Sequence, residues 1–193
     1  MKHHVVVLVM AVGLPVLGLA QAYTSIESYL AADGLPLIQV NSLQTAEIGQ
    51  PLGLFSFMQV RADYAQAYGG VTLPVDWCQL ALGVGAQQFN GLWSWRLGGY
   101  LVVGDQPDTI ANNSVRAAVV AAETGVDGLW LRGQVNFPVW PQLGLGCFGE
   151  TVLGVGPRLE YCPPWLPLQL GVSPLYDFKT EAWHCIIGAT FNW

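Results

Sequence analysis

The sequence predicts an all-β protein, an antiparallel up-and-down transmembrane β-barrel. Three observations predict this fold class. Apolar residues alternate with small or polar ones along most of the chain, charged residues make up only 10% of it, and no second hydrophobic helix follows the N-terminus. Soluble domains contain about 25% charged residues. A soluble protein with so few charges would struggle to cover its surface, so the chain either places its outer face in lipid or assembles heavily.

The N-terminus has the pattern of a cleavable signal peptide. After a weakly basic start, residues 5–20 form an uncharged and mostly apolar run, and Ala20-Gln21-Ala22 has the small-x-small form of a cleavage site. The alternative is an uncleaved anchor, but the run is shorter than the ~20 residues that a spanning helix needs, and Pro15 interrupts it. We therefore expect residues 1–22 to be removed on export.

Alternation with period two indicates strands with two different faces. Between residues 77 and 88, one face holds Cys78, Leu80, Leu82, Val84 and Ala86, and the other holds Gln79, Ala81, Gly83, Gly85 and Gln87. In a soluble sandwich the second face would meet water. Here that face is rich in small residues and glutamine, with about one arginine per strand, which fits the crowded lumen of a narrow barrel.

The arginines support this assignment of the two faces. All five fall on the small or polar face of a strand candidate, where they avoid the ~2–4 kcal/mol cost of arginine in the lipid midplane. Three acids and a histidine share these inner faces. The predicted lumen charge network is Arg61, Asp63, Arg96, Arg116, Arg132, Glu150, Arg158, Glu160 and His184.

Nine stretches of the chain alternate: 52–67, 71–87, 91–103, 113–123, 128–138, 142–149, 152–161, 165–173 and 182–193. Bacterial single-chain barrels have even strand numbers. Residues 142–149 and 152–161 keep the same parity, so we merge them and favour eight strands. Ten strands, with Leu35 to Leu43 as the first, is the alternative. Residues 23–50 are then a periplasmic or rim segment with a short helix near residues 25–32, and residues 51–193 form the barrel.

The C-terminal strand resembles the last strand of outer-membrane β-barrel proteins of Gram-negative bacteria. Apolar residues alternate there and the chain ends on an aromatic residue; the assembly signal would be Ile187, Ala189, Phe191 and Trp193. The resemblance covers about ten residues, and the alternation extends it loosely over residues 52–193. It implies that the protein lies in the outer membrane, with outer-membrane lipid and the outer-membrane assembly machinery as partners.

Charge argues against nucleic acid as a partner. Residues 1–22 hold one of the seven basic residues and none of the thirteen acids, so the charge of the mature chain would be −7. A phosphate-binding surface needs a basic excess. We therefore expect no nucleic-acid partner, and no polybasic patch for anionic lipid.

No cofactor or metal site is predicted. Gly144-Leu145-Gly146-Cys147-Phe148-Gly149 satisfies G-x-G-x-x-G, but a strand-like segment follows it where a dinucleotide site needs a helix. These glycines more plausibly make room for bulky neighbours in the lumen. The four cysteines lack paired C-x-x-C spacing. By parity Cys78, Cys147 and Cys185 face lipid, and in a merged strand Cys147 and Cys162 would be too far apart to bond.

The leading functional hypothesis is a non-enzymatic barrel with a filled interior, which serves envelope structure or surface interaction. A narrow anion-favouring pore is the first alternative, because five inward arginines against three inward acids leave an excess of two positive charges. A lipid-modifying enzyme that uses His184 is the second, although the H-x-S pattern of such enzymes is absent. A soluble periplasmic barrel that binds an apolar ligand is the third.

Overall fold

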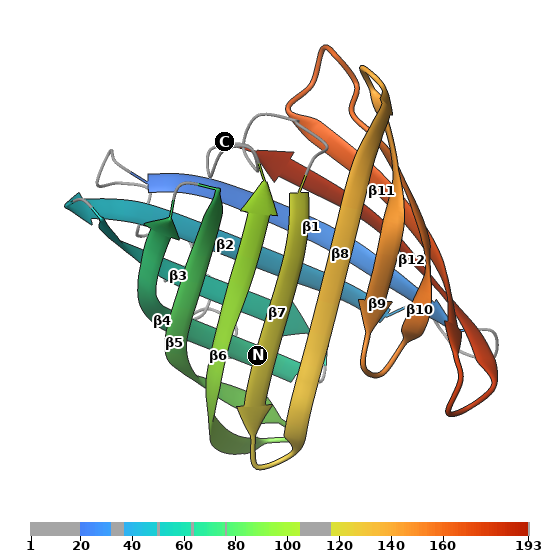
Figure 1. Cartoon of the computed structure of the whole chain (residues 1–193). Helices are drawn as coiled ribbons and strands as arrows, with labels where there is room; N and C mark the ends of the chain where they lie inside the picture. Colours follow the sequence, from blue (N-terminus) through green and yellow to red (C-terminus); the bar gives the residue numbers. More distant parts are fainter. Residues whose placement is uncertain are drawn as a thin grey trace.

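The computed structural model is a closed barrel of twelve antiparallel strands (Figure 1). It describes residues 20–31, 37–49, 51–62, 64–75, 77–104 and 117–192. The strands are β1 (Ala20–Ala31), β2 (Leu37–Gly49), β3 (Leu52–Arg61), β4 (Tyr64–Val75), β5 (Cys78–Phe89), β6 (Leu92–Gly104), β7 (Ala117–Gly125), β8 (Gly128–Trp140), β9 (Leu143–Glu150), β10 (Gly154–Tyr161), β11 (Leu168–Asp177) and β12 (Ala182–Asn192). In this part of the chain, no helix is long and apolar enough to cross a membrane.

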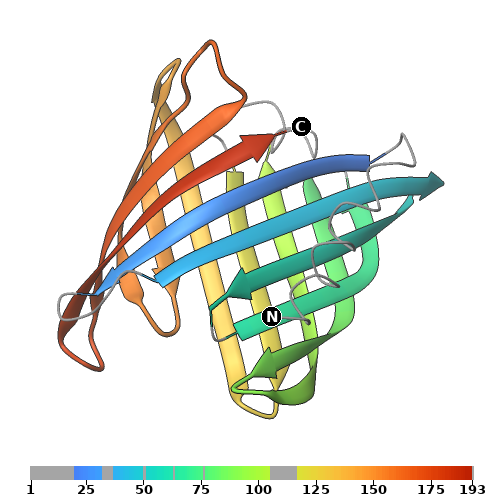
Figure 2. The same ribbon diagram turned by 180° about the vertical axis from the view of Figure 1, so that it is seen from behind.

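The barrel is closed by its first and last strands. Each strand pairs with its neighbours in the chain, and β1 pairs with both β2 and β12, as the view from behind shows (Figure 2). The pairing of β1 with β12 begins at Tyr23 opposite Asn192. The antiparallel barrel is thus confirmed. The predicted number of strands, eight or ten, is wrong, because the closed barrel contains twelve.

Short connections explain two of the four strands that are missing from the expected eight. The stretch 52–67 divides into β3, which ends at Arg61, and the start of β4 at Tyr64, and these two residues pair with each other. Neither glycine nor proline stands between them in the sequence. The merged stretch 142–161 is a hairpin of β9 and β10, joined by the turn Thr151–Leu153. A three-residue turn keeps the outward residues of both strands on odd numbers, so the parity continues through it. The positive φ of Gly154, 93°, marks where the second strand begins.

The N-terminal strands lie where the sequence analysis expected a rim segment. Residues 25–31 of the expected helix lie in β1, and residues 37–49 form β2, so residues 20–31 and 37–49 belong to the barrel. Both strands carry polar residues on their inner face, among them Ser25, Glu27 and Asn41, which weakens their apolar alternation. The predicted signal peptide lies outside the described residues, except for Ala20–Ala22 at the start of β1.

Because the strands alternate in direction, their connections divide between two ends of the barrel. We call the end of the barrel where β1 begins and β12 ends the terminal end, and the opposite end the distal end. The connections between β6 and β7 and between β10 and β11 both lie at the terminal end.

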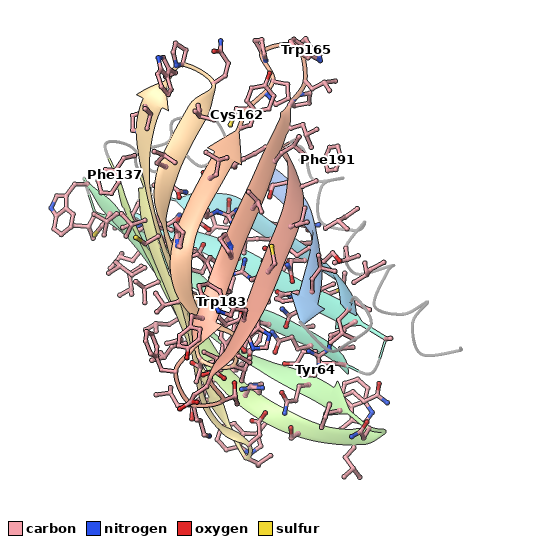
Figure 3. All side chains as sticks on the ribbon, turned by 90° about the vertical axis from the view of Figure 1, so that its right-hand side faces the viewer. Tyr64, Phe137, Cys162, Trp165, Trp183 and Phe191 are labelled. Carbon is pink, nitrogen blue, oxygen red and sulfur yellow. The ribbon has the colours of Figure 1, made fainter. Side chains whose placement is uncertain are left out.

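The outer face of the barrel is apolar and carries two aromatic belts. Leucine, valine and isoleucine side chains that are 37–65% exposed occupy outward positions on most strands, among them Leu82 and Val84. Exposed aromatic residues mark both ends (Figure 3): Trp77, Phe137, Trp140, Trp165 and Phe191 toward the terminal end, and Phe89, Trp93, Trp95, Phe178 and Trp183 toward the distal end. An apolar band between two aromatic belts is the lipid-facing surface of a transmembrane barrel.

Candidate binding site in the barrel interior

The barrel encloses a cavity of about 240 Å³ between two chemically different walls. The aromatic wall comes from β2–β6 and holds Leu43, Phe55, Phe57, Tyr68, Tyr100 and Val102. The ionic wall comes from β1, β8 and β10 and holds Glu27, Arg132, Gln134, Arg158 and Glu160. Eight-stranded barrels are just wide enough to be filled by side chains. With twelve strands, the interior keeps a space that a small molecule could enter.

Glycines let the aromatic wall lie flat. A Cβ atom added to Gly83 on β5 would lie 2.7 Å from the Phe55 ring, and one added to Gly98 on β6 would lie 2.9 Å from the Tyr68 ring. Real Cβ atoms do not approach so closely, so each ring needs these neighbours to be glycine. Phe55 also meets Tyr100 edge to face, with ring centroids 5.4 Å apart. The rings therefore cover the wall instead of filling the lumen.

The ionic wall centres on an ion pair between Arg132 on β8 and Glu27 on β1. Arg132 donates two hydrogen bonds to the Glu27 carboxylate, one of them at 2.9 Å from Nη1 to Oε2, and Glu150 on β9 lies 3.8 Å away. The hydroxyl of Tyr29 donates to Glu27 at 2.8 Å, and the amide of Asn41 does so at 3.1 Å. The Glu27 side chain is 7% exposed. Its charge is thus held by several donors away from water.

The Glu27–Arg132 pair crosses the lumen. Along the shorter path round the barrel, β9, β10, β11 and β12 separate the two strands. The sector behind the pair is filled by Phe148, Leu175 and Ile186, each at most 1% exposed. Phe148 lies below two guanidinium groups, with the Cζ atoms of Arg132 and Arg158 at 4.8 and 5.7 Å from its ring centroid. This packing fills the distal part of the sector, whereas Gln169 of β11 and Thr190 of β12, nearer the terminal end, line the cavity.

A second ion pair lies beside the first. Arg158 Nε donates to Glu160 Oε1 at 2.5 Å, and Gln134 donates to the same oxygen at 2.8 Å. The other carboxylate oxygen, Glu160 Oε2, is buried and has no hydrogen-bond partner. Arg158 lies flat over Gly171, where an added Cβ would be 2.6 Å from Nη2. The pair is neutral overall but keeps one acceptor unused.

A third cluster lies toward the distal end, on β4–β7. Arg96 approaches Glu123 at 3.7 Å and Asp127 at 3.1 Å. Glu123 accepts hydrogen bonds from the Tyr68 hydroxyl at 2.9 Å and from Gln66 at 3.3 Å. Because the hydroxyl of Tyr68 reaches Glu123 while its ring covers Gly98, this residue joins the aromatic wall to the charges. The cluster neutralises Arg96.

The structure places most of the predicted charge network on the inner face. Arg132, Glu150, Arg158 and Glu160 gather on β8–β10, whereas Arg96 lies apart from them on β6. Arg61 is at the distal end of β3, 5.2 Å from the Tyr64 ring centroid. Asp63 and Arg116 lie outside the described residues.

Sequence reasoning missed two central acids, Glu27 and Glu123. Glu27 falls in the segment that was expected to be a short helix, and Glu123 lies at the end of a stretch whose other strand residues are mostly small. With them, the described interior holds four glutamates and the four arginines Arg61, Arg96, Arg132 and Arg158. The expected excess of two positive charges is therefore not found among the described residues.

The remaining candidate residues form no site with the described ones. His184 lies at the distal end of β12, beside Leu175 of β11, and no hydrogen bond joins it to a serine in the described chain. Cys78, Cys147, Cys162 and Cys185 are unbonded. No described cluster of histidine, cysteine and acids could hold a metal ion. Of the glycine-rich motif, Gly146 faces Asn136, whose Oδ1 would lie 2.6 Å from an added Cβ.

The residues of the proposed assembly signal lie on the last strand. Ile187 and Phe191 on β12 face outward, 48% and 41% exposed, and Ala189 shares their parity. Trp193 is outside the described residues. Ile187, Ala189 and Phe191 belong to β12, which pairs with β1 and so closes the barrel.

Comparison with known proteins finds solved structures of similar fold. No protein-family model and no curated protein matches the chain. A solved structure described as KdgM porin gives a TM-score of 0.57 at 10% identity, over 89% of this chain and 99% of the porin. KdgM porin in complex with disordered oligogalacturonate gives 0.57 at 9% identity over the same shares. A structure from a study of in-meso crystallization of membrane proteins gives 0.59 at 12%, over 89% of this chain and 83% of that one. The resemblance to outer-membrane β-barrel proteins is thereby confirmed, and the chain is similar in fold to outer-membrane porins.

Proposed function

We propose that this protein is an outer-membrane channel for small solutes. The observation that carries the proposal is the cavity of about 240 Å³ inside a closed twelve-stranded barrel. Pockets that bury drug-sized ligands measure about 300–1,000 Å³. The cavity therefore suits molecules of few heavy atoms, and a polymer would need the interior to rearrange.

Location in the outer membrane is supported by the surface of the barrel. The apolar band, the aromatic belts and the alternating last strand fit insertion by the outer-membrane assembly machinery into outer-membrane lipid. Export would use residues 1–22 as a signal peptide. Cleavage after Ala22 would leave the pairing of β1 with β12 intact, since that pairing begins at Tyr23.

The charge balance of the interior argues against strong anion preference. Arg96, Arg132 and Arg158 each pair with a glutamate, so none of these three is available to an anion without breaking a pair. One of the similar porins was solved with oligogalacturonate, an acidic oligosaccharide. For this chain we propose no such substrate, and we replace the anion-favouring pore of the sequence analysis by a weakly selective one.

A role without catalysis remains part of the proposal. His184 has neither a serine nor an acid hydrogen-bonded to it among the described residues, so the geometry gives the lipid-modifying alternative no support. The sequence analysis expected side chains to fill the barrel interior. Such filling is supported only in the sector behind the Glu27–Arg132 pair, where Phe148, Leu175 and Ile186 pack.

Planar-bilayer recording tests the channel. We expect discrete single-channel steps from the purified, folded protein, with a reversal potential near zero in a potassium chloride gradient. Boiled protein, whose unfolding is checked by its altered mobility on a denaturing gel, serves as the control. Absence of steps from protein that is folded by this gel criterion would contradict the proposal, and a strongly anionic reversal potential would restore the anion-favouring alternative.

A further inference from the structure

The Glu27–Arg132 pair crosses the lumen at the cavity. It spans from β1 to β8, and both side chains line the cavity. Removing one partner of such a pair leaves a buried charge without compensation, which is strongly unfavourable. A simple anion that bound Arg132 would free Glu27, and a simple cation that bound Glu27 would free Arg132. A solute with both charges could replace the pair without leaving either residue unpaired.

Unused acceptors lie beside this pair. Glu160 lines the cavity, its side chain is 1% exposed, and its Oε2 atom has no hydrogen-bond partner. Glu150 Oε2, 3.8 Å from Arg132 Nη1, is also buried and has no hydrogen-bond partner, although Glu150 is not among the residues that line the cavity. Buried polar atoms in folded proteins nearly always have a partner. These oxygens therefore indicate a missing donor, such as an ammonium group with three N–H bonds.

The opposite wall of the same cavity is apolar. Phe55, Phe57 and Tyr100 face the charges of Arg132 and Glu160 across the cavity that all five line. Aromatic faces bind apolar side chains through large contact areas. A ligand that fills this space must therefore present charge on one side and hydrocarbon on the other.

We propose that the lumen binds a small zwitterion with an apolar side chain, of the chemical class of hydrophobic amino acids. The carboxylate of the ligand takes Arg132 from Glu27, its ammonium takes Glu27 and the free oxygen of Glu160, and its side chain lies against the aromatic wall. The inference rests on the proposed channel and names its preferred solute class. Arg132 and Glu160 are its specificity-determining residues.

Four related compounds separate the contributions of the three groups. L-Phenylalanine carries both charges and a ring, 3-phenylpropionate lacks the ammonium, 2-phenylethylamine lacks the carboxylate, and glycine lacks the side chain. Binding to the folded protein in detergent micelles is measured by calorimetry, and current block is measured in the bilayer. We expect phenylalanine to bind at least about 10-fold more tightly than each of the other three. Two of them lose a buried charge partner, which costs at least this factor, and glycine loses the burial of a ring, which is worth about 1.5–3 kcal/mol, about 10-fold or more.

Two variants identify the site. Glu160→Gln and Arg132→Gln should each weaken phenylalanine binding about 10-fold or more. The ratio of phenylalanine affinity to 3-phenylpropionate affinity should fall in Glu160→Gln. The ratio of phenylalanine affinity to 2-phenylethylamine affinity should fall in Arg132→Gln. Glu181→Gln and Arg61→Gln are the matched controls, because neither residue lines the cavity. Every variant is first tested for heat-dependent gel mobility. If a lumen variant fails to fold, the four-compound series on the wild-type protein still decides the question.

The outcomes separate this inference from the channel itself. Channel steps together with equal affinity for the four compounds would overturn the zwitterion site and leave the channel standing. Tight phenylalanine binding by calorimetry without any channel steps would support the site and contradict the channel. Equal effects of the lumen and control variants on phenylalanine binding would also overturn the proposed site.

Discussion

The aromatic and ionic walls of the lumen solve the same packing problem in opposite ways. On β3–β6, large side chains lie along the wall because glycines on the next strands leave room for them: Phe55 over Gly70 and Gly83, and Tyr68 over Gly85 and Gly98. On the other side, Arg132 extends across the lumen to Glu27. One wall keeps the barrel open, and the other divides it.

The difference shows that neighbours on adjacent strands decide how far an inward side chain reaches. Arg158 has Gly171 beside it and lies flat. Arg132 instead has the Phe148 ring beneath its guanidinium, at 4.8 Å, and continues toward β1. Because Phe148 also lies 5.7 Å from the Arg158 guanidinium, the glycine is what distinguishes the two arginines. Gly171 leaves room for Arg158 along the wall, whereas Arg132 extends into the lumen. Substitutions of Arg132, of Phe148 and of the glycines and rings of the aromatic wall test this comparison.

The largest effect is expected from Arg132→Met, which removes the connection across the lumen. Glu27 and Glu150 would lose their cation while buried, at 7% side-chain exposure each. Breaking a buried pair from one side costs about 3–5 kcal/mol. We expect a loss of this size in the free energy of unfolding, measured by urea titration in detergent micelles, together with a higher single-channel conductance.

The double variant Glu27→Gln with Arg132→Met is the control for this change. It removes one buried charge along with the cation, and the amide can still bond to Asn41 and Tyr29, which donate to Glu27 in the parent. We expect it to recover much of the lost stability but to keep the raised conductance. Equal stability of the single variant and the parent would show that the pair does not hold the two sides together.

A somewhat smaller effect is expected from Phe148→Ala, which empties the filled sector. Phe148 is 1% exposed and packs with Leu175 and Ile186. Replacing a buried phenylalanine by alanine costs about 3 kcal/mol or more when the site does not collapse. The same change removes the support below Arg132 and Arg158. Urea titration measures the loss, and Phe137→Ala, a lipid-facing residue that is 62% exposed, is the comparison that should cost less.

The sequence was sufficient to predict which way most side chains point. The outward positions of Leu82, Val84 and Leu97 follow from period-two alternation, because lipid demands an unbroken apolar face. Placement of Arg96, Arg132 and Arg158 away from lipid follows from the same demand. The membrane thus imposes a local rule, and a local rule can be read from residues that are close together in the chain.

The count of strands and the identity of ion-pair partners could not be predicted in this way. Parity continues through the turn Thr151–Leu153, so alternation alone does not show where one strand ends. The partner of Arg132 is 105 residues away. It lies on β1, whose inner face is polar, so apolar alternation does not identify this segment as a strand. Which strand stands across the lumen depends on the closure of the whole barrel, which no single segment encodes.

Adding one methyl group to the aromatic wall should move a ring into the lumen. In Gly98→Ala, the new Cβ would lie 2.9 Å from the Tyr68 ring and 3.4 Å from Cγ of Glu123. Overpacking of this kind costs about 1–3 kcal/mol. We expect a loss of about 2 kcal/mol on urea titration and a lower conductance. Gly69→Ala is the matched control on β4, because nothing lies within 4 Å of its added Cβ; similar losses for both would contradict the glycine platform.

The smallest effect is expected from Tyr68→Phe, which separates the ring from its hydroxyl. The ring would still cover Gly98, but Glu123 would lose the donor now at 2.9 Å. A hydrogen bond to a charged group contributes about 1.5–3 kcal/mol. Because Arg96 still pairs with Glu123 and Gln66 still donates to it, we expect the lower limit, about 1.5 kcal/mol, on urea titration and almost unchanged conductance. Tyr161→Phe, on the outer face, should have no measurable effect. A large conductance change in Tyr68→Phe would mean that its hydroxyl, and not the glycines beside it, holds the ring against the wall.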